Sequence, residues 1–175
     1  MDLIGERVRL RRSRPEDADV EAPIFALPDV ARFTGRHLLL PQSAARLREV
    51  NSDQSGRLAW TVTSREDGSV LGDTTLFRFN HLDRHCWFAI TLGPPERLGK
   101  GLGTETTILV TRFAFRQLGM EKVCLAVFEG NERAIAAYRK AGYEVEATLR
   151  RHHLLEGQLV VEYWMAAFRD HPLYG

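Results

Sequence analysis

The stretch Arg97-Leu98-Gly99-Lys100-Gly101-Leu102-Gly103-Thr104 places glycine at every second position, between the apolar run Trp87 to Leu92 and the segment Glu105 to Leu118. The apolar run is typical of a strand, and the later segment has the composition and spacing of an amphipathic helix. Glycines permit positive φ angles and close approach to a ligand, and the first turn of a helix presents unpaired N–H donors at the positive end of its dipole. The stretch therefore predicts an anion site, with a phosphate or pyrophosphate as its natural ligand.

The spacing of these glycines argues against two common nucleotide sites. A nucleoside-triphosphate loop has four residues between its first glycine and the Gly-Lys pair, followed by Ser or Thr. Here Gly93 precedes Gly99-Lys100 by one residue too many, and Gly101 stands where the magnesium-binding hydroxyl is needed. A dinucleotide fingerprint needs glycine at the position of Thr104. Neither nucleotide site fits the sequence well.

Two motifs, taken together and in this order, resemble the GNAT family of N-acetyltransferases. The residues from Leu98 to Gly103, followed by Thr104-Glu105, are similar to the family's acyl-CoA loop, usually written Arg/Gln-x-x-Gly-x-Gly/Ala. The residues from Asn131 to Tyr143 are similar to its second signature, Asn-x-x-Ala-x-x-x-Tyr-x-x-x-Gly-Phe/Tyr. Within the family, the two motifs most resemble those of the RimJ/RimL-type branch, and the resemblance extends over nearly the whole chain.

This resemblance implies acetyl-CoA as the acyl donor and implies which residues contact it. One position departs from the family pattern, because Leu98 occupies the usual Arg/Gln position. The side-chain contact to the pyrophosphate is then either lost or supplied by Arg97 or Lys100. The implied contacts come from a strand, the glycine loop and a later helix, and they are Ile90, Thr91, Leu92, Arg97, Leu98, Gly99, Lys100, Gly101, Leu102, Gly103, Thr104, Asn131, Arg133 and Tyr138.

The composition is that of an ordinary globular domain. The chain has 175 residues, 44% hydrophobic and 27% charged, which is enough to bury a core. Its formal net charge of +1 argues against a dedicated nucleic-acid partner. No apolar run is long enough to span a membrane, and the first residues show no signal-peptide pattern. The length of the chain predicts one domain over residues 1–175. Because Cys86 and Cys124 suggest no disulfide framework, we expect this domain in the cytoplasm.

Periodicity and turn residues predict the secondary structure. Strands are expected at 7–11, 57–63, 70–79, 84–92, 123–128, 143–150 and 158–168, and helices at 15–27, 41–50, 105–118 and 131–141, with Ser13 as a cap of the first helix. Strand, helix, strand between 84 and 128 predicts a parallel pair in one sheet. Together with the resemblance, this implies an α/β (α+β) GNAT-like fold with a mixed, mostly antiparallel twisted sheet and helices on both faces.

The implied reaction is direct attack of an amine on the thioester carbonyl of acetyl-CoA. Tyr138 matches the family's general acid, because a phenol is protonated at neutral pH and can donate a proton to the departing thiolate. The alternative for Tyr138 is a core tyrosine of an amphipathic helix. Asn131 matches a polar contact near the pantetheine, and it is equally suited to cap the helix that it opens. The two residues are the predicted catalytic pair.

The general base is not assigned by the sequence. Many relatives have a glutamate on the strand before the glycine loop, and the corresponding position is Trp87, which cannot accept a proton. Cys124 could accept an acyl group in a two-step route, but a buried cysteine is more often an apolar filler. Residues that could titrate usefully, each more often a simple surface residue, are His81, His85, His152, His153 and Glu129. Aromatic residues that either wall an acceptor pocket or fill the core are Phe33, Trp60, Phe77, Phe79 and Trp87.

The sequence therefore predicts an acetyl-CoA-dependent N-acetyltransferase that acts on a primary amine, either a protein N-terminus or a small molecule. Its expected partners are acetyl-CoA and the amine, with a homodimer open, and no metal, nucleic acid or membrane is expected. A non-catalytic acyl-CoA-binding or regulatory module of the same fold is the alternative, and Trp87 and Leu98 favour it. A structural subunit that pairs through its last two strands is a third hypothesis.

Overall fold

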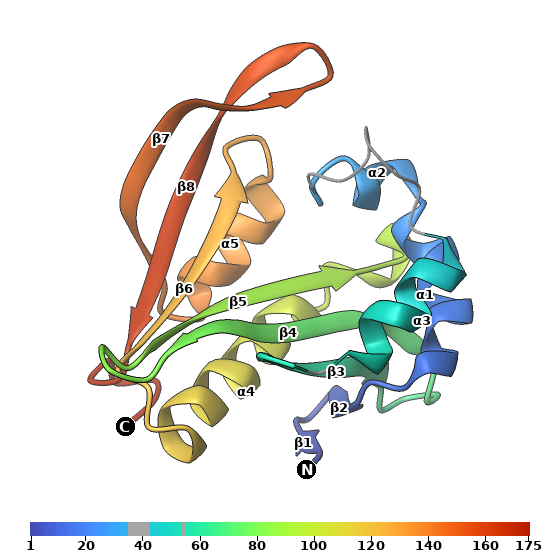
Figure 1. The fold of residues 1–175 in the computed structure, drawn as a ribbon, viewed down its shortest axis with the longest axis horizontal. Coiled ribbons are helices and arrows are strands. Elements are labelled where there is room, and N and C mark those ends of the chain that lie inside the picture. Colours follow the sequence, from blue (N-terminus) through green and yellow to red (C-terminus); the bar gives the residue numbers. More distant parts are fainter. Residues whose placement is uncertain (35–42, 54) are drawn as a thin grey trace.

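A computed structural model of the chain describes residues 1–34, 43–53 and 55–175. Within these residues one twisted sheet has eight strands in the order β1-β2-β3-β4-β5-β6-β8-β7 (Figure 1). Neighbouring strands are antiparallel except for β5 and β6, so the sheet is mixed and mostly antiparallel, as predicted. The strands are β1 (Leu3–Ile4), β2 (Val8–Arg12), β3 (Arg57–Ser64), β4 (Val70–Asn80), β5 (His85–Leu92), β6 (Lys122–Phe128), β7 (Glu144–Leu155) and β8 (Gln158–Phe168).

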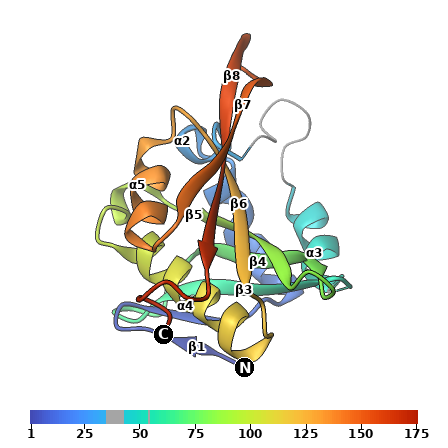
Figure 2. The ribbon, with the colours of Figure 1, turned by 90° about the vertical axis from the view of Figure 1, so that its left-hand side faces the viewer.

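Helices cover both faces of the sheet, which confirms the predicted fold class (Figures 1 and 2). On one face α4 (Leu102–Gln117) and α5 (Glu132–Lys140) share the main core with the sheet, through residues such as Leu76, Phe88 and Phe115. On the other face α1 (Ala18–Phe25), α2 (Pro28–Ala31) and α3 (Ala44–Ser52) form a smaller cluster. Short 3₁₀ turns, η1 (Pro15–Asp17) and η2 (Pro95–Arg97), precede α1 and α4.

The two parallel strands separate after a short paired start. β5 and β6 pair only at His85↔Lys122, Cys86↔Val123 and Trp87↔Cys124. Beyond these residues β5 continues to Leu92 and β6 to Phe128 without pairing, and Figure 1 shows the two strands diverging. Backbone groups of β5 beyond Trp87 are therefore open to a ligand on this side, because a strand edge without a partner leaves N–H and C=O groups unpaired.

Most predicted elements are present, with shifted ends. The main helix begins at Leu102 rather than Glu105, and the first predicted helix is broken into η1 and α1. The expectation that Ser13 caps that helix is wrong: Arg14 is the N-cap residue, and the Asp17 carboxylate accepts a hydrogen bond from its N–H at 2.9 Å. Asp17 can accept this hydrogen bond because two hydrogen bonds from the Arg11 guanidinium hold its carboxylate in position.

The second predicted helix is α3, which Ser43 caps by accepting a hydrogen bond from the Arg46 N–H at 3.2 Å. The predicted residues 41 and 42, and Gly35 and His37 in the segment before them, lie outside the described residues. No helix in the described part of the chain is both long and apolar enough to cross a membrane.

The last hairpin differs more from the prediction. β7 continues to Leu155, so His152 and His153 lie in a strand and not in a turn, and the turn itself is Glu156-Gly157. The prediction ended this strand too early because Arg150 to His153 is a polar run without alternation. These residues belong to a strand because β7 pairs with β8 on both sides of them, at Leu149 and from His153 onward. The two strands project beyond the rest of the sheet (Figure 2).

Candidate functional site

A cavity of about 700 Å³ lies where β5 and β6 separate. Its walls come from both faces of the sheet, so that it joins the side covered by α4 and α5 to the side covered by α1, α2 and α3. Side chains of Ile90, Leu92 and Leu102 line the first side, and those of Phe25, Val30 and Leu47 line the second. A cavity through a split sheet can hold two reactants that approach one strand edge from opposite faces.

The glycine loop forms one end of this cavity, as the sequence predicts. Gly99 and Gly101 have φ angles of 85° and 80°, a left-handed conformation that favours glycine. Gly101 is the N-cap residue of α4, and no side chain in the described part of the chain caps it. The first N–H groups of α4 are therefore available, together with the positive end of the helix dipole, for an anionic ligand.

The start of α4 is held in place from outside the cavity. The Glu105 carboxylate accepts hydrogen bonds from the backbone N–H groups of Glu6 and Arg7 in the turn between β1 and β2. An acidic side chain in the first turn also suits the helix dipole. Because Glu105 is turned toward β1, its charge is directed away from the ligand and the orientation of the helix start is fixed.

The structure brings nearly all of the predicted donor-site residues to this cavity. The strand and loop contributions are Ile90, Thr91, Leu92, Leu98, Gly99, Gly101, Leu102, Gly103 and Thr104, and the contributions of the later helix are Asn131, Arg133 and Tyr138. Lys140, which the sequence analysis missed, also lines the cavity from α5. The sequence could have indicated this, because Lys140 lies seven residues after Arg133 and therefore on the same face of the helix, two turns further along.

Arg97 and Lys100 lie elsewhere. The Arg97 guanidinium donates to the Ser69 hydroxyl and, at 2.9 Å, to the Asp67 carboxylate in the turn between β3 and β4. Both basic residues line a second, smaller cavity of about 410 Å³ beside Glu66. Arg97 thus anchors the loop to the sheet, and Arg133 and Lys140 are the basic side chains that line the main cavity on the α5 side.

Tyr138 lies over the strand separation, with 8% of its surface exposed. Its ring makes a T-shaped contact with Phe88 at 6.4 Å between centroids and a tilted one with Tyr143 at 6.1 Å. Burial raises the pKa of the Tyr138 hydroxyl well above its usual value, so the group stays protonated. It is both a core tyrosine and a cavity residue, and its role as a general acid stays a prediction.

Asn131 performs the capping role that the sequence allowed. Its side-chain oxygen accepts a hydrogen bond from the Ala134 N–H at 3.3 Å, which fixes the start of α5. The same residue lines the cavity. Its amide N–H₂ group is a donor that the cap does not use.

The face of the sheet toward α1 to α3 forms the other end of the cavity. Opposed residues of β4 and β5 on this face are Asp73↔Thr91, Thr75↔Ala89 and Phe77↔Trp87, and all of them line the cavity. Asp29 reaches it from α2, and Arg57 from β3. Phe33 also lines it, whereas Trp60 and Phe79 belong to the core on the opposite side.

Asp73 is the notable residue that sequence reasoning missed. A carboxylate in the middle of a strand is unusual, because Asp is depleted in strands, and that was the available signal. Asp73 lies directly across from Thr91, in a central strand that is paired on both sides, and both residues line the cavity. The end toward α1 to α3 thus carries Asp29, Arg57 and Asp73, and the α5 side carries Arg133 and Lys140.

The other candidate bases do not line the cavity. His81 is exposed in the turn after β4 and stacks on Phe79, and His85 lies at the opposite end of β5. The Glu129 carboxylate accepts a hydrogen bond from the Tyr163 hydroxyl at 2.9 Å. Burial raises the pKa of the Cys124 thiol, which disfavours the thiolate that a two-step route needs. His152 and His153 meet at Glu162, away from the residues that line the cavity.

Trp87 contributes a wall and no proton acceptor. Its indole makes a T-shaped contact with Trp164 of β8 at 5.0 Å between centroids, and the Arg78 guanidinium lies 5.7 Å from the indole centroid. These contacts close the acceptor end where β5 and β6 begin to separate.

Comparisons with known proteins identify the family and the fold. A family model described as an acetyltransferase (GNAT) domain matches residues 7–144. Spermidine N(1)-acetyltransferase of Escherichia coli K12 is 38% identical over 92 residues, which are 53% of this chain and 49% of that enzyme. The chain thus aligns with about half the length of that relative. An SPbeta prophage-derived N-acetyltransferase of Bacillus subtilis, YokL, is 28% identical over 148 residues, covering 84% of this chain and 81% of the relative.

Solved structures share the fold. The spermidine N-acetyltransferase from Vibrio cholerae, crystallised in complex with CoA and spermine, superposes with a TM-score of 0.84 and 18% identity, over 95% of this chain and 98% of that chain. A GNAT-family acetyltransferase from Bacillus anthracis superposes with a TM-score of 0.83 and 13% identity, over 98% of this chain and 100% of that chain. At this identity the likeness concerns the fold alone.

Proposed function

Because this chain belongs to the GNAT acetyltransferase family, we propose that it is an N-acetyltransferase that moves an acetyl group from acetyl-CoA to a primary amine by direct attack. The observation that carries the proposal is the cavity at the β5–β6 separation. It has the glycine loop and the start of α4 at one end, and Asp29 and Asp73 at the other. A donor and an acceptor bound in this cavity meet at the open edge of β5.

In the proposed mechanism the pyrophosphate binds at the first turn of α4, and the pantetheine arm runs along Ile90 to Leu92. Arg133 and Lys140 attract the phosphates from α5. Backbone N–H groups of β5 polarise the thioester carbonyl and stabilise the oxyanion. The amine nitrogen bonds to the carbonyl carbon, the C–S bond breaks, and the departing thiolate takes the proton of the Tyr138 hydroxyl. The second proton that the attacking nitrogen loses on becoming an amide passes through water and returns the Tyr138 phenolate to its hydroxyl form.

The amine must bind as a cation and react as a neutral nucleophile. We propose that Asp73 attracts the ammonium group and accepts its proton, directly or through a water molecule. This residue takes the place of the glutamate whose position Trp87 occupies, because it lies on the neighbouring strand and on the same face. Proton transfer by a positioned carboxylate is an ordinary form of base catalysis.

The acceptor class follows from the charge of this end. Asp29 and Asp73 outnumber Arg57 at this end, and this excess of negative charge among aromatic walls favours a small cationic amine, as does the similarity to spermidine acetyltransferases. A protein N-terminal amine, as expected for a RimJ/RimL-type enzyme, is the second candidate, since the cavity is open to solvent. A cytoplasmic location and a homodimer remain part of the proposal, the first supported by two buried free thiols.

Release of free thiol from acetyl-CoA, measured against a panel of polyamines, amino sugars and peptides, tests the function. Binding of CoA should be measured in parallel by calorimetry. Turnover with one amine class supports the enzyme and identifies its acceptor. Saturable CoA binding without turnover on any acceptor supports the non-catalytic module, which Trp87 and Leu98 favour. A chain that binds no CoA contradicts both.

A further inference from the structure

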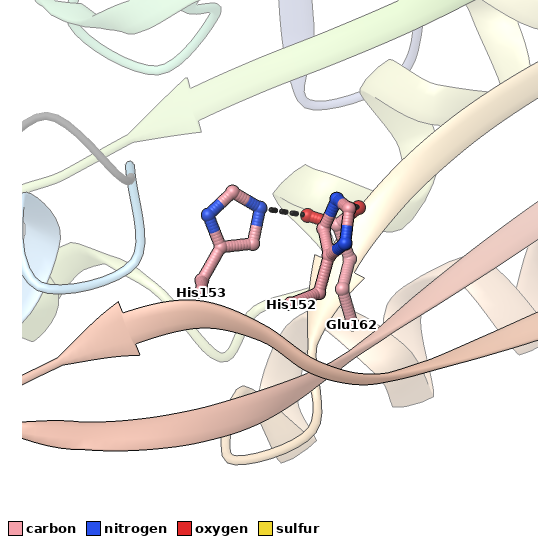
Figure 3. Close-up of side chains that lie close together, drawn as sticks. All are labelled: His152, His153 and Glu162. Atoms are coloured by element: carbon pink, nitrogen blue, oxygen red, sulfur yellow. Dashed lines mark hydrogen bonds and ion pairs between the residues drawn. The ribbon is translucent and has the colours of Figure 1, made fainter.

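Three side chains with metal-binding donor atoms lie together on the last hairpin, outside the cavity described above (Figure 3). His153 Nε2 lies 2.7 Å from Glu162 Oε2, and His152 Nε2 lies 3.9 Å from Glu162 Oε1. All three donor atoms are within 4.8 Å of one another. The histidines come from β7 and the glutamate from β8, where the two strands cross (Figure 3).

Consecutive residues of a strand normally point to opposite faces, so two adjacent histidines should not share one partner. A bulge in β7 makes it possible. Leu149 pairs with Glu162 and His153 with Val160, so β7 has two more residues than β8 over this span. Arg151, inside the bulge, has a φ of 55°. A non-glycine residue in this left-handed region costs about 1 kcal/mol or more, and such strain tends to collect at functional sites.

The carboxylate at the centre is buried without a permanent cation. Glu162 is 7% exposed, and it accepts a hydrogen bond from the Trp164 indole N–H at 2.8 Å in addition to its contact with His153. Among the residues that the structure describes, no lysine or arginine forms an ion pair with it. Buried carboxylates are generally paired with a charge or bound to a metal ion.

We propose that His152, His153 and Glu162 bind a divalent transition-metal ion of the zinc class. Two imidazoles and one carboxylate are a donor set that suits Zn²⁺ with a fourth position for water. Bond lengths of about 2.0–2.2 Å in a tetrahedral site separate neighbouring donor atoms by about 3.4 Å. The two observed contacts, 2.7 and 3.9 Å, lie on either side of that value. Both histidines are nearly half exposed, so small ring rotations complete the site.

Trp164 connects this site to the rest of the molecule. Its indole N–H orients the Glu162 carboxylate, and its ring contacts Trp87, a wall of the acceptor end of the cavity. A bound ion would hold the β7 bulge against β8 and thereby keep this wall in place. The site goes beyond the proposed acetyl transfer, and neither proposal depends on the other.

Titration of the untagged, chelator-treated protein with Zn²⁺, followed by calorimetry, tests the proposal. Co²⁺ serves as a second probe, because tetrahedral Co²⁺ has a distinctive visible absorption. We expect one ion per chain with a dissociation constant of about 10 μM or below. Glu162→Gln and His153→Ala should each weaken binding about 100-fold. Trp164→Phe removes only the N–H group that orients the Glu162 carboxylate, so it should weaken binding about 10- to 100-fold.

His81→Ala removes an exposed histidine far from the site along the chain and should leave binding unchanged. Glu162→Gln keeps an acceptor for Trp164, so its circular dichroism spectrum should match that of the unmodified protein. Binding only at about 1 mM or above, or equal affinity of the Glu162→Gln variant, would overturn the proposal. Loss of binding in His81→Ala would do so too, because it would locate the ion elsewhere.

Discussion

At the scale of single residues, Tyr138 is the proposed proton donor because it lines the cavity and carries a hydroxyl that is protonated at neutral pH. Burial raises the pKa of this hydroxyl, which keeps the proton in place and also makes the group a weaker acid. Replacing Tyr138 by Phe keeps the ring contacts with Phe88 and removes only the donor. We expect kcat to fall by about 10²- to 10⁴-fold, with little change in CoA affinity, as measured by steady-state kinetics and calorimetry.

Tyr143 provides a matched control for this substitution. It is equally buried, and its hydroxyl shares a 2.6 Å hydrogen bond with the Thr111 hydroxyl, but it does not line the cavity. Tyr143→Phe should lower the free energy of unfolding by about 1 kcal/mol and leave kcat unchanged. Equal losses of kcat in both variants would contradict a proton-donor role for Tyr138.

Asp73 is expected to act on the amine and not on acetyl-CoA. Asp73→Asn keeps the shape and removes the negative charge, so kcat/KM for the amine should fall by at least about 100-fold, while the CoA dissociation constant stays the same. Asp83→Asn, in the exposed turn after β4, is the control and should change neither value. A variant with unchanged amine kinetics would remove Asp73 from the mechanism.

At the scale of the elements, the turn into α4 depends on backbone conformation more than on side chains. Gly101 has a φ of 80° at the N-cap, whereas Gly103 lies within the helix, and a Cβ there would be 3.8 Å from Leu92 Cδ1, an ordinary contact. Gly101→Ala should therefore lower the free energy of unfolding by about 1–2 kcal/mol, and Gly103→Ala should leave it unchanged or slightly higher. Urea denaturation measures both, and the reverse order would contradict the assigned geometry.

The contact between α1, α3 and β3 contains a buried acid. Glu21 accepts hydrogen bonds from Asn51 at 3.1 Å and from the Thr61 hydroxyl at 3.3 Å. Burial raises the pKa of Glu21, and the hydrogen bond from Asn51 opposes this only in part. Because the folded state keeps the proton to higher pH than the unfolded state, the associated stability is complete below the unfolded pKa, about 4.3, and is lost as pH rises through the folded pKa.

Glu21→Gln removes this titration. Relative to the unmodified protein, the free energy of unfolding of the variant should increase as pH rises from 4 to 8, by about 1.4 kcal/mol for each unit of the pKa shift. Urea denaturation at several pH values measures the difference. Glu16→Gln, at an exposed site of η1, is the control and should show a smaller pH-dependent difference. A constant difference for Glu21→Gln would show that its ionisation is not coupled to folding.

At the scale of the whole molecule, the separation of β5 and β6 leaves the sheet unpaired along β5 beyond Trp87, where we propose that CoA binds. Binding of CoA at 100 times its dissociation constant should raise the free energy of unfolding by about 2.7 kcal/mol. Hydrogen exchange should slow at residues 88–92 of β5 and in the first turn of α4. The tip of the β7–β8 hairpin, residues 154–159, is an internal control, and protection there with none in β5 would contradict the assigned donor site.

The sequence alone determined most of the elements and the glycine loop and helix start at one end of the cavity. Alternation and turn residues encode strands locally, the Gly99–Gly103 spacing encodes a backbone conformation, and the residues from Asn131 to Tyr138 lie on one helix. Such features depend on neighbours within a few positions, so a linear pattern contains them. The fold class could be predicted for this reason. Most of the residues predicted to contact acetyl-CoA line one cavity, and the contact itself stays a prediction.

Only the tertiary structure decided what depends on register between distant segments. It placed Asp73 across from Thr91 and turned Arg97 toward Asp67. It also brought His152 and His153 to Glu162, through a bulge that exists only because β7 pairs with β8. No local period encodes which residues face each other across strands, because strand pairing, twist and bulges set that together once the sheet has formed.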